Sequence, residues 1–115
     1  MSAPVTLPVT PLAASASFTE SSFSPYPEHS GILDADWIVV VASSDQAGTV
    51  YVDQSVDAVS VARSDELATS ADPGPQGGQS ALLKVQIVLP YHRVRYVNGT
   101  TAQARFVLVK RYVPT

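Results

Sequence analysis

The sequence contains no cysteine and only two histidines among its 115 residues. The absence of cysteine excludes disulfide bonds, thiolate metal sites and a cysteine nucleophile. The histidines, His29 and His92, lack the spacing of any zinc site. No Gly-x-Ser-x-Gly element accompanies the many serines. We therefore predict no catalytic residue, no metal site and no cofactor site, and we expect a protein that is not an enzyme.

Long hydrophobic runs are also missing. No stretch approaches the roughly 18 apolar residues needed to cross a bilayer, so we expect no membrane partner. The N-terminus has no basic region and no long apolar run behind it, so we expect no signal peptide and synthesis in the cytoplasm.

The remaining motifs that could bind a ligand are weak. Asp34 and Asp36 supply two carboxylates, but a calcium loop needs more oxygen ligands and a glycine at its sharp bend. The glycine-rich stretch 74–78 is not followed by Lys-Ser or Lys-Thr, so it is not a phosphate-binding loop. We interpret the first as a solvated turn and the second as a surface loop.

Charged residues are few and unevenly distributed. All ten acidic residues lie between Glu20 and Asp72, and six of the seven basic residues lie between Lys84 and Arg111. Acidic and basic strands that are neighbours in one sheet would neutralise each other locally, and we favour this interpretation. The alternative is that an acidic face of one copy meets a basic face of the next. The net charge of −3 makes nucleic acid an unexpected partner.

The first 30 residues hold five of the nine prolines and seven serines. Proline fixes φ and lacks an amide donor, so this stretch resists helix and central strand. We predict an extended N-terminal arm over residues 1–30 and a sandwich domain over residues 31–115. The apolar side chains of the arm are predicted to bind a partner: Val5, Leu7, Val9, Leu12 and Phe18. The alternative is that the arm folds back and covers an edge strand of its own domain.

From residue 37 onward, short β-strand patterns alternate with turn signals. Strands are predicted over 37–41, 49–55, 81–89, 91–97 and 103–113, with a weaker strand near 58–61 and a turn of helix near 66–68. The first two are predicted to form a hairpin, and Asn98-Gly99 is a good turn dipeptide before the last strand. These patterns predict an all-β fold, an antiparallel β-sandwich with an extended Pro/Ser-rich N-terminal arm.

Alternation within each strand predicts which side chains point inward. The predicted core is Trp37, Val39, Val41, Val50, Val52, Val85, Ile87, Val94, Tyr96, Phe106 and Leu108. A domain of this size is marginally stable alone, so we expect a homo-oligomer or an assembly with other proteins.

Four arginines in or beside the last two predicted strands could form a basic face at an interface: Arg93, Arg95, Arg105 and Arg111. The alternative is a solvent-facing surface paired with acidic residues of earlier strands. Aromatic residues such as Tyr51 could stack on sugar rings, so a glycan is retained as a partner. Aromatic side chains in strands nevertheless serve more often in packing.

The segment 91–103, with Arg105-Phe106-Val107-Leu108 behind it, resembles the C-terminal hairpin of small β-sandwich proteins and modules in tailed-bacteriophage particles. The segment 44–55 resembles the first hairpin of the same family. A glycine-and-tryptophan turn often follows that hairpin in the family, and residues 57–60 replace it here. The resemblance implies a sandwich fold and a virion location, and it carries no functional site.

The resemblance therefore implies a bacteriophage virion structural protein, made in the host cytoplasm. We expect a capsid decoration (cement) protein that bridges and stabilises neighbouring capsid subunits. Its partners would be the major capsid protein or other virion proteins. The alternatives are a tail, baseplate or head-fibre component, or a host-glycan-binding module on the particle.

Overall fold

The computed structural model describes residues 4–25, 37–71 and 78–113, which form ten strands and no helix. The strands are β1 (Val5–Thr6), β2 (Ser17–Thr19), β3 (Ser24–Pro25), β4 (Trp37–Ser44), β5 (Gly48–Ser55), β6 (Val61–Ala68), β7 (Ser70–Ala71), β8 (Gln79–Gln86), β9 (Tyr91–Asn98) and β10 (Phe106–Val113). His29, Asp34 and Asp36 lie outside the described residues.

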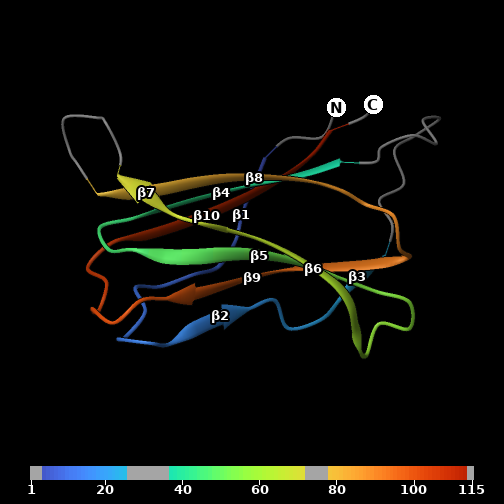
Figure 1. Ribbon diagram of the computed structural model, residues 1–115, viewed down its shortest axis with the longest axis horizontal. Helices are drawn as coiled ribbons and strands as arrows, with labels where there is room; N and C mark the ends of the chain where they lie inside the picture. Colours follow the sequence, from blue (N-terminus) through green and yellow to red (C-terminus); the bar gives the residue numbers. More distant parts are fainter. Residues whose placement is uncertain (1–3, 26–36, 72–77, 114–115) are drawn as a thin grey trace.

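The strands form two antiparallel sheets that face each other (Figure 1). Sheet A has the order β1-β10-β4-β8-β7, and sheet B has the order β2-β9-β5-β6, with β3 also pairing with β9. This arrangement confirms the predicted all-β sandwich. The weak strand predicted near 58–61 is displaced, because the strand runs from Val61 to Ala68. The helical turn predicted near 66–68 is therefore wrong.

Both predicted hairpins are instead connections between the two sheets. β4 belongs to sheet A and β5 to sheet B, and β9 and β10 are divided in the same way. The two connections are bound to each other, because Asp45 in the first accepts hydrogen bonds from the amides of Ala104 and Arg105 in the second. A turn sequence serves a hairpin and a crossing equally well. The crossing occurs here because β4 finds partners on both sides, β10 and β8.

The predicted inward face of β4 is also wrong. Ile38, Val40 and Ala42 are fully buried, whereas Val41 is 38% exposed. Trp37 and Val39 share the outward face with Val41, because side chains alternate along a strand. Every residue from 37 to 41 is apolar, so the strand carried no alternation from which its register could be predicted.

The other strands have the predicted inward faces. Their members of the predicted core are all buried: Val50, Val52, Val85, Ile87, Val94, Tyr96, Phe106 and Leu108. The Tyr96 and Phe106 rings pack with their centroids 4.6 Å apart. Gly48 lies against the Tyr96 ring, where a β-carbon would collide with it, so this position requires glycine.

The N-terminal segment, as far as the structure describes it, folds back onto its own sandwich. β1 pairs with β10 at the edge of sheet A, and β2 and β3 pair with β9 at the edge of sheet B. Between them, the Asn98 and Gln103 side chains bond to the backbone of Leu12. The segment therefore crosses from one sheet to the other along one side of the sandwich (Figure 1).

Candidate functional site

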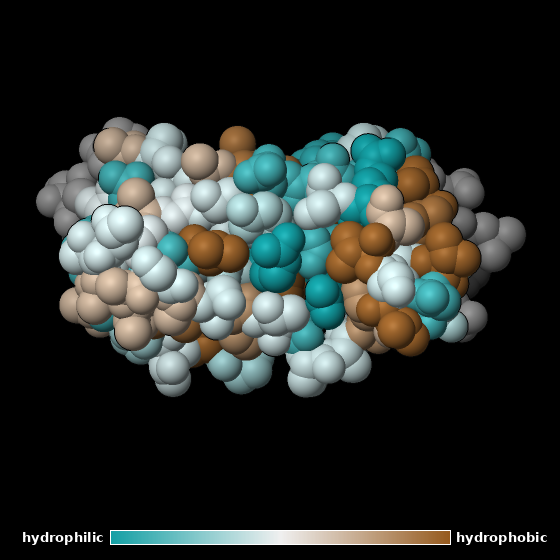
Figure 2. Space-filling view, turned by 60° about the horizontal axis from the view of Figure 1, so that its bottom comes forward, coloured by the Kyte–Doolittle hydropathy of each residue, from teal (hydrophilic) through white to brown (hydrophobic). Residues whose placement is uncertain are grey.

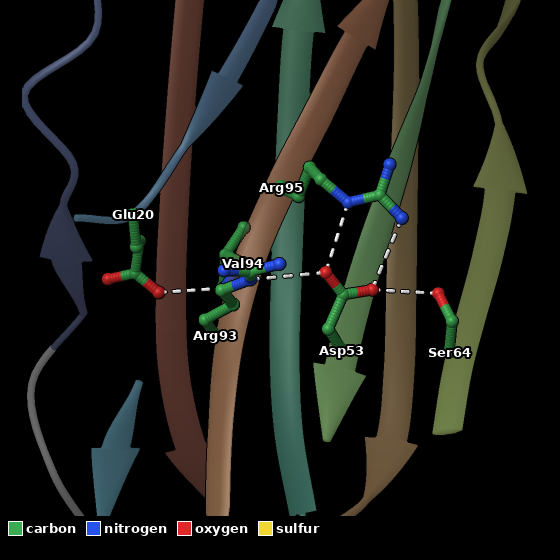
Figure 3. A network of polar contacts seen from close by, with 6 residues as sticks. All are labelled: Glu20, Asp53, Ser64, Arg93, Val94 and Arg95. Carbon is green, nitrogen blue, oxygen red and sulfur yellow. Dashed lines mark hydrogen bonds and ion pairs between the residues drawn. The ribbon is translucent and has the colours of Figure 1, made fainter. Parts of the chain in front are cut away.

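The outer face of sheet B carries a polar network centred on Asp53 of β5 (Figure 3). Asp53 is fully buried, although it points away from the core, because neighbouring side chains cover it. Arg95 donates to it through Nε at 3.0 Å and through Nη2 at 3.2 Å, and Arg93 donates through Nε at 3.3 Å. Ser64 of β6 donates a fourth hydrogen bond at 2.8 Å.

Strand pairing fixes the geometry of this network. Asp53 lies opposite Arg93 on β9 and opposite Ser64 on β6, and Arg95 is one position further along the same face. Burial acts to raise the pKa of Asp53, but the hydrogen bonds and charges of the arginines and of Ser64 outweigh it and lower the pKa. The carboxylate is therefore held ionised between its two cations.

Aromatic rings fix the two guanidinium groups from outside. Arg95 lies 3.9 Å from the centroid of the Tyr51 ring, and Arg93 lies 4.4 Å from that of Phe23. Cation–π contacts of this kind stabilise an arginine in one position. Figure 2 shows this side of the molecule, where hydrophilic side chains gather in the middle and hydrophobic ones at the end near the β5–β6 turn.

A second ionic cluster joins the N-terminal segment to both sheets. Glu20 accepts a hydrogen bond from the amide of Val94 on β9 at 2.7 Å and one from Lys110 Nζ on β10 at 2.8 Å. The side chains of Glu20 and Lys110 are 14% and 11% exposed. One carboxylate thus bridges sheet B to sheet A near the side of the sandwich that the N-terminal segment covers.

His92 lies beside this cluster in the interior. Its Nε2 and the hydroxyl of Tyr112 are hydrogen-bonded at 2.6 Å. Burial and the charge of Lys110 lower the pKa of His92 to about 4, although Glu20 acts in the opposite direction. His92 is therefore neutral at neutral pH and serves as a packing and hydrogen-bonding group.

The contacts of the two clusters join separate strands and segments of the fold. Both carboxylates are ion-paired, Asp53 with Arg93 and Arg95 and Glu20 with Lys110. Among the described residues, no group of three or more His, Cys, Asp or Glu side chains could hold a metal ion. No helix in the described ranges is long and apolar enough to cross a membrane.

The structure separates the four arginines predicted at an interface. Arg93 and Arg95 are on the outer face of sheet B, whereas Arg111 is opposite Val39 on the outer face of sheet A. Arg105 lies before β10 and donates to the Ser44 carbonyl. They do not form one basic face. Asp53 of β5 pairs with Arg93 and Arg95 of the neighbouring strand β9, which is local neutralisation of the kind we favoured. A role of the four arginines at an interface stays a prediction.

The apolar side chains of the predicted arm mostly contact the chain's own core. Leu7 is buried there, and Val9, Leu12 and Phe18 pack against it. Val5 alone of the five is largely exposed, at 48%. Contact of this segment with a partner stays a prediction, for which Val5 is the accessible side chain.

The outer face of sheet A carries a group of apolar side chains that sequence reasoning placed inside or did not consider. Val109, Val41 and Leu82 lie side by side on β10, β4 and β8. Val107 and Val39 flank this row, and we call these five residues the apolar face. Val41, Leu82 and Val107 are 38%, 60% and 43% exposed. The unbroken apolar run of β4 was the sequence signal for this face, because a strand that is apolar at every position has apolar side chains on both of its faces.

Comparisons with known proteins identify the family. Residues 4–113 match the family described as the N-terminal domain of the uncharacterised protein YqxG, and the chain belongs to this family. The match includes both the predicted arm and the predicted sandwich domain. No curated protein matches the sequence.

One solved structure, titled "Crystal structure of PBSX exported protein XepA", is similar to this fold with a TM-score of 0.70 and 19% sequence identity. The similarity covers 98% of this chain and 37% of that chain, so this chain spans little more than a third of that protein. At this identity the similarity shows a shared fold.

Proposed function

We propose that the protein is a structural component of a bacteriophage particle that decorates the capsid and stabilises contacts between its subunits. The observation that carries this proposal is the apolar face of sheet A. Large exposed apolar groups on a rigid sheet are typical of surfaces that bind another protein. We assign the capsid contact to this face.

Three further features support the proposal. The ionic clusters around Asp53 and Glu20 join strands of the sandwich, which is a structural role. The sequence resembles β-sandwich modules of tailed phages. The protein with a similar fold is titled an exported protein of PBSX. We accordingly propose a protein without enzymatic activity.

The partner that fits the apolar face is a protein surface with apolar side chains bordered by carboxylates. Lys84 and Arg111 lie on either side of Val39, next to the row formed by Val109, Val41 and Leu82. These two cations favour acidic groups at the rim of the partner's surface. Such charge pairs would fix the orientation of the bound partner more than they would raise its affinity.

The test is to measure the protein in purified particles by quantitative mass spectrometry and to compare two variants. Leu82→Glu places a charge in the apolar face, whereas Gln86→Glu places the same charge at an exposed position of the same strand. Both variants should fold. We expect Leu82→Glu to be lost from the particles and Gln86→Glu to be retained.

The copy number decides between the alternatives. Hundreds of copies in each particle are expected for capsid decoration, whereas a few copies would indicate a tail, baseplate or fibre component. Recovery of the protein only in the medium, free of particles, would overturn the proposal. That result would favour a role as an exported protein, as in the name of XepA.

A further inference from the structure

The four outer edges of the two sheets are unequal. β1, β2 and β7 end three of them with only two or three residues each, whereas β6 ends sheet B with eight. In Figure 3, β6 (olive) is the outermost strand at the right and no strand lies beyond it. An edge of this length presents unpaired amides and carbonyls that can accept another strand.

The charges of β6 are arranged in a self-complementary order. Arg63 and Asp65 project from one face of the strand, 53% and 33% exposed, and their side chains are 3.1 Å apart. Ser64 and Glu66 project from the other face, because side chains alternate. The bulge opposite Gln54 and Ser55 ends the regular part of the strand near Ala62.

We propose that β6 pairs with β6 of a second copy, antiparallel about a two-fold axis through Ser64. In this register Arg63 of each copy lies opposite Asp65 of the other, so two arginines and two aspartates alternate across the interface. Ala62 lies opposite Glu66, and the ladder spans residues 62–66 of each copy. Such an interface is isologous and closes as a dimer.

The neighbouring registers are excluded by the same charges. An axis at Arg63 places two arginines directly opposite each other, and an axis at Asp65 or Glu66 places two carboxylates opposite each other. Like charges in directly opposite positions destabilise a strand pair, whereas opposite charges stabilise it. Among these four registers the charges therefore favour the one with its axis at Ser64.

The experiment measures self-association of the full chain by sedimentation velocity over a range of concentrations, with three variants. Arg63→Asp and Asp65→Arg each create like-charge contacts at both ends of the axis. Lys84→Asp is the control, with the same change of charge as Arg63→Asp at an exposed position on sheet A. We expect wild type and Lys84→Asp to dimerise, and each β6 variant to dimerise more than about tenfold more weakly.

Mixing the two β6 variants gives the decisive result. In the mixed dimer every introduced charge faces an opposite charge, so we expect association to return in the mixture. Both variants remain net acidic, because the wild-type charge is −3, so overall attraction cannot explain recovery. Among residues 62–66, the alternate amides that point away from β5 should gain protection from hydrogen exchange only in the wild type and in the mixture, because the others are already bonded to β5.

A wild type that stays monomeric at all concentrations would overturn the proposal. So would a mixture that fails to associate, or a loss of association by Lys84→Asp as large as that by Arg63→Asp. Circular dichroism on each variant establishes that the strands are formed. If Leu82→Glu abolished dimerisation and both β6 variants retained it, the interface would be the apolar face and not β6.

Discussion

Glu20 and Lys110 form an ion pair at 2.8 Å across 90 positions of the sequence, and this pair ties the N-terminal segment to the last strand. Lys110 is on the inward face of β10, where it is 8% exposed. A lysine in that position requires a carboxylate, and only the N-terminal segment brings one to it among the described residues.

Removing one member of this pair should strongly destabilise the protein. Lys110→Met leaves Glu20 without its cation in a nearly buried site, so we expect a loss of about 3–5 kcal/mol in the free energy of unfolding. Urea unfolding followed by Trp37 fluorescence measures it. Arg63→Met, which breaks the exposed pair with Asp65, is the control and should cost less than about 1 kcal/mol at low protein concentration. Equal losses in both variants would contradict the assignment.

The free energy of unfolding should decrease as the pH is lowered, because His92 is buried and neutral in the folded protein. Its pKa is about 4 in the folded protein, below the ordinary 6.5, so the unfolded chain binds the proton more readily. The contribution is complete above pH 6.5 and is lost as pH falls toward 4, by up to about 3 kcal/mol. Urea unfolding at pH 7 and pH 5 measures the change. A His92→Gln variant with the same dependence on pH would assign it to other groups.

Asp53 should couple Arg93 and Arg95 energetically. Arg95 makes two hydrogen bonds to Asp53 and Arg93 makes one, so Arg95→Met should cost more than Arg93→Met. Either arginine alone still neutralises the carboxylate. The double variant leaves a buried carboxylate without a cation, so its cost should exceed the sum of the single costs by about 1–3 kcal/mol. Simple additivity in a double-mutant cycle would show that the two arginines act independently.

The N-terminal segment should stabilise the sandwich through Leu7. Leu7 is 5% exposed, whereas Val5 on the same strand segment is 48% exposed. We expect Leu7→Ala to cost about 2–4 kcal/mol and Val5→Ala to cost less than about 0.5 kcal/mol. Thermal unfolding of the two variants provides the measurement. If the segment were a free arm that binds only a partner, neither substitution would change the stability of the isolated protein.

The strands could be predicted where polar and apolar residues alternate. Val94 and Tyr96 were placed inward correctly, because arginines separate them on β9. β4 lacked such separation, so its inward face was predicted one residue out of register. The Asp53 network was foreseen only as a general pairing of acidic and basic strands, since the sequence holds ten acids and seven bases and does not state which pairs meet.

The sequence by itself determined the all-β class, the extended character of the N-terminal segment and most of the inward-facing residues, because these follow from local pattern and from proline content. Only the tertiary structure decided that the turns after β4 and β9 cross between sheets, and that the N-terminal segment packs on its own core. It also brought Glu20 to Lys110. These outcomes depend on contacts between residues far apart in the chain. The burial of apolar faces and of charges decides which residues become partners, and no local pattern encodes that choice.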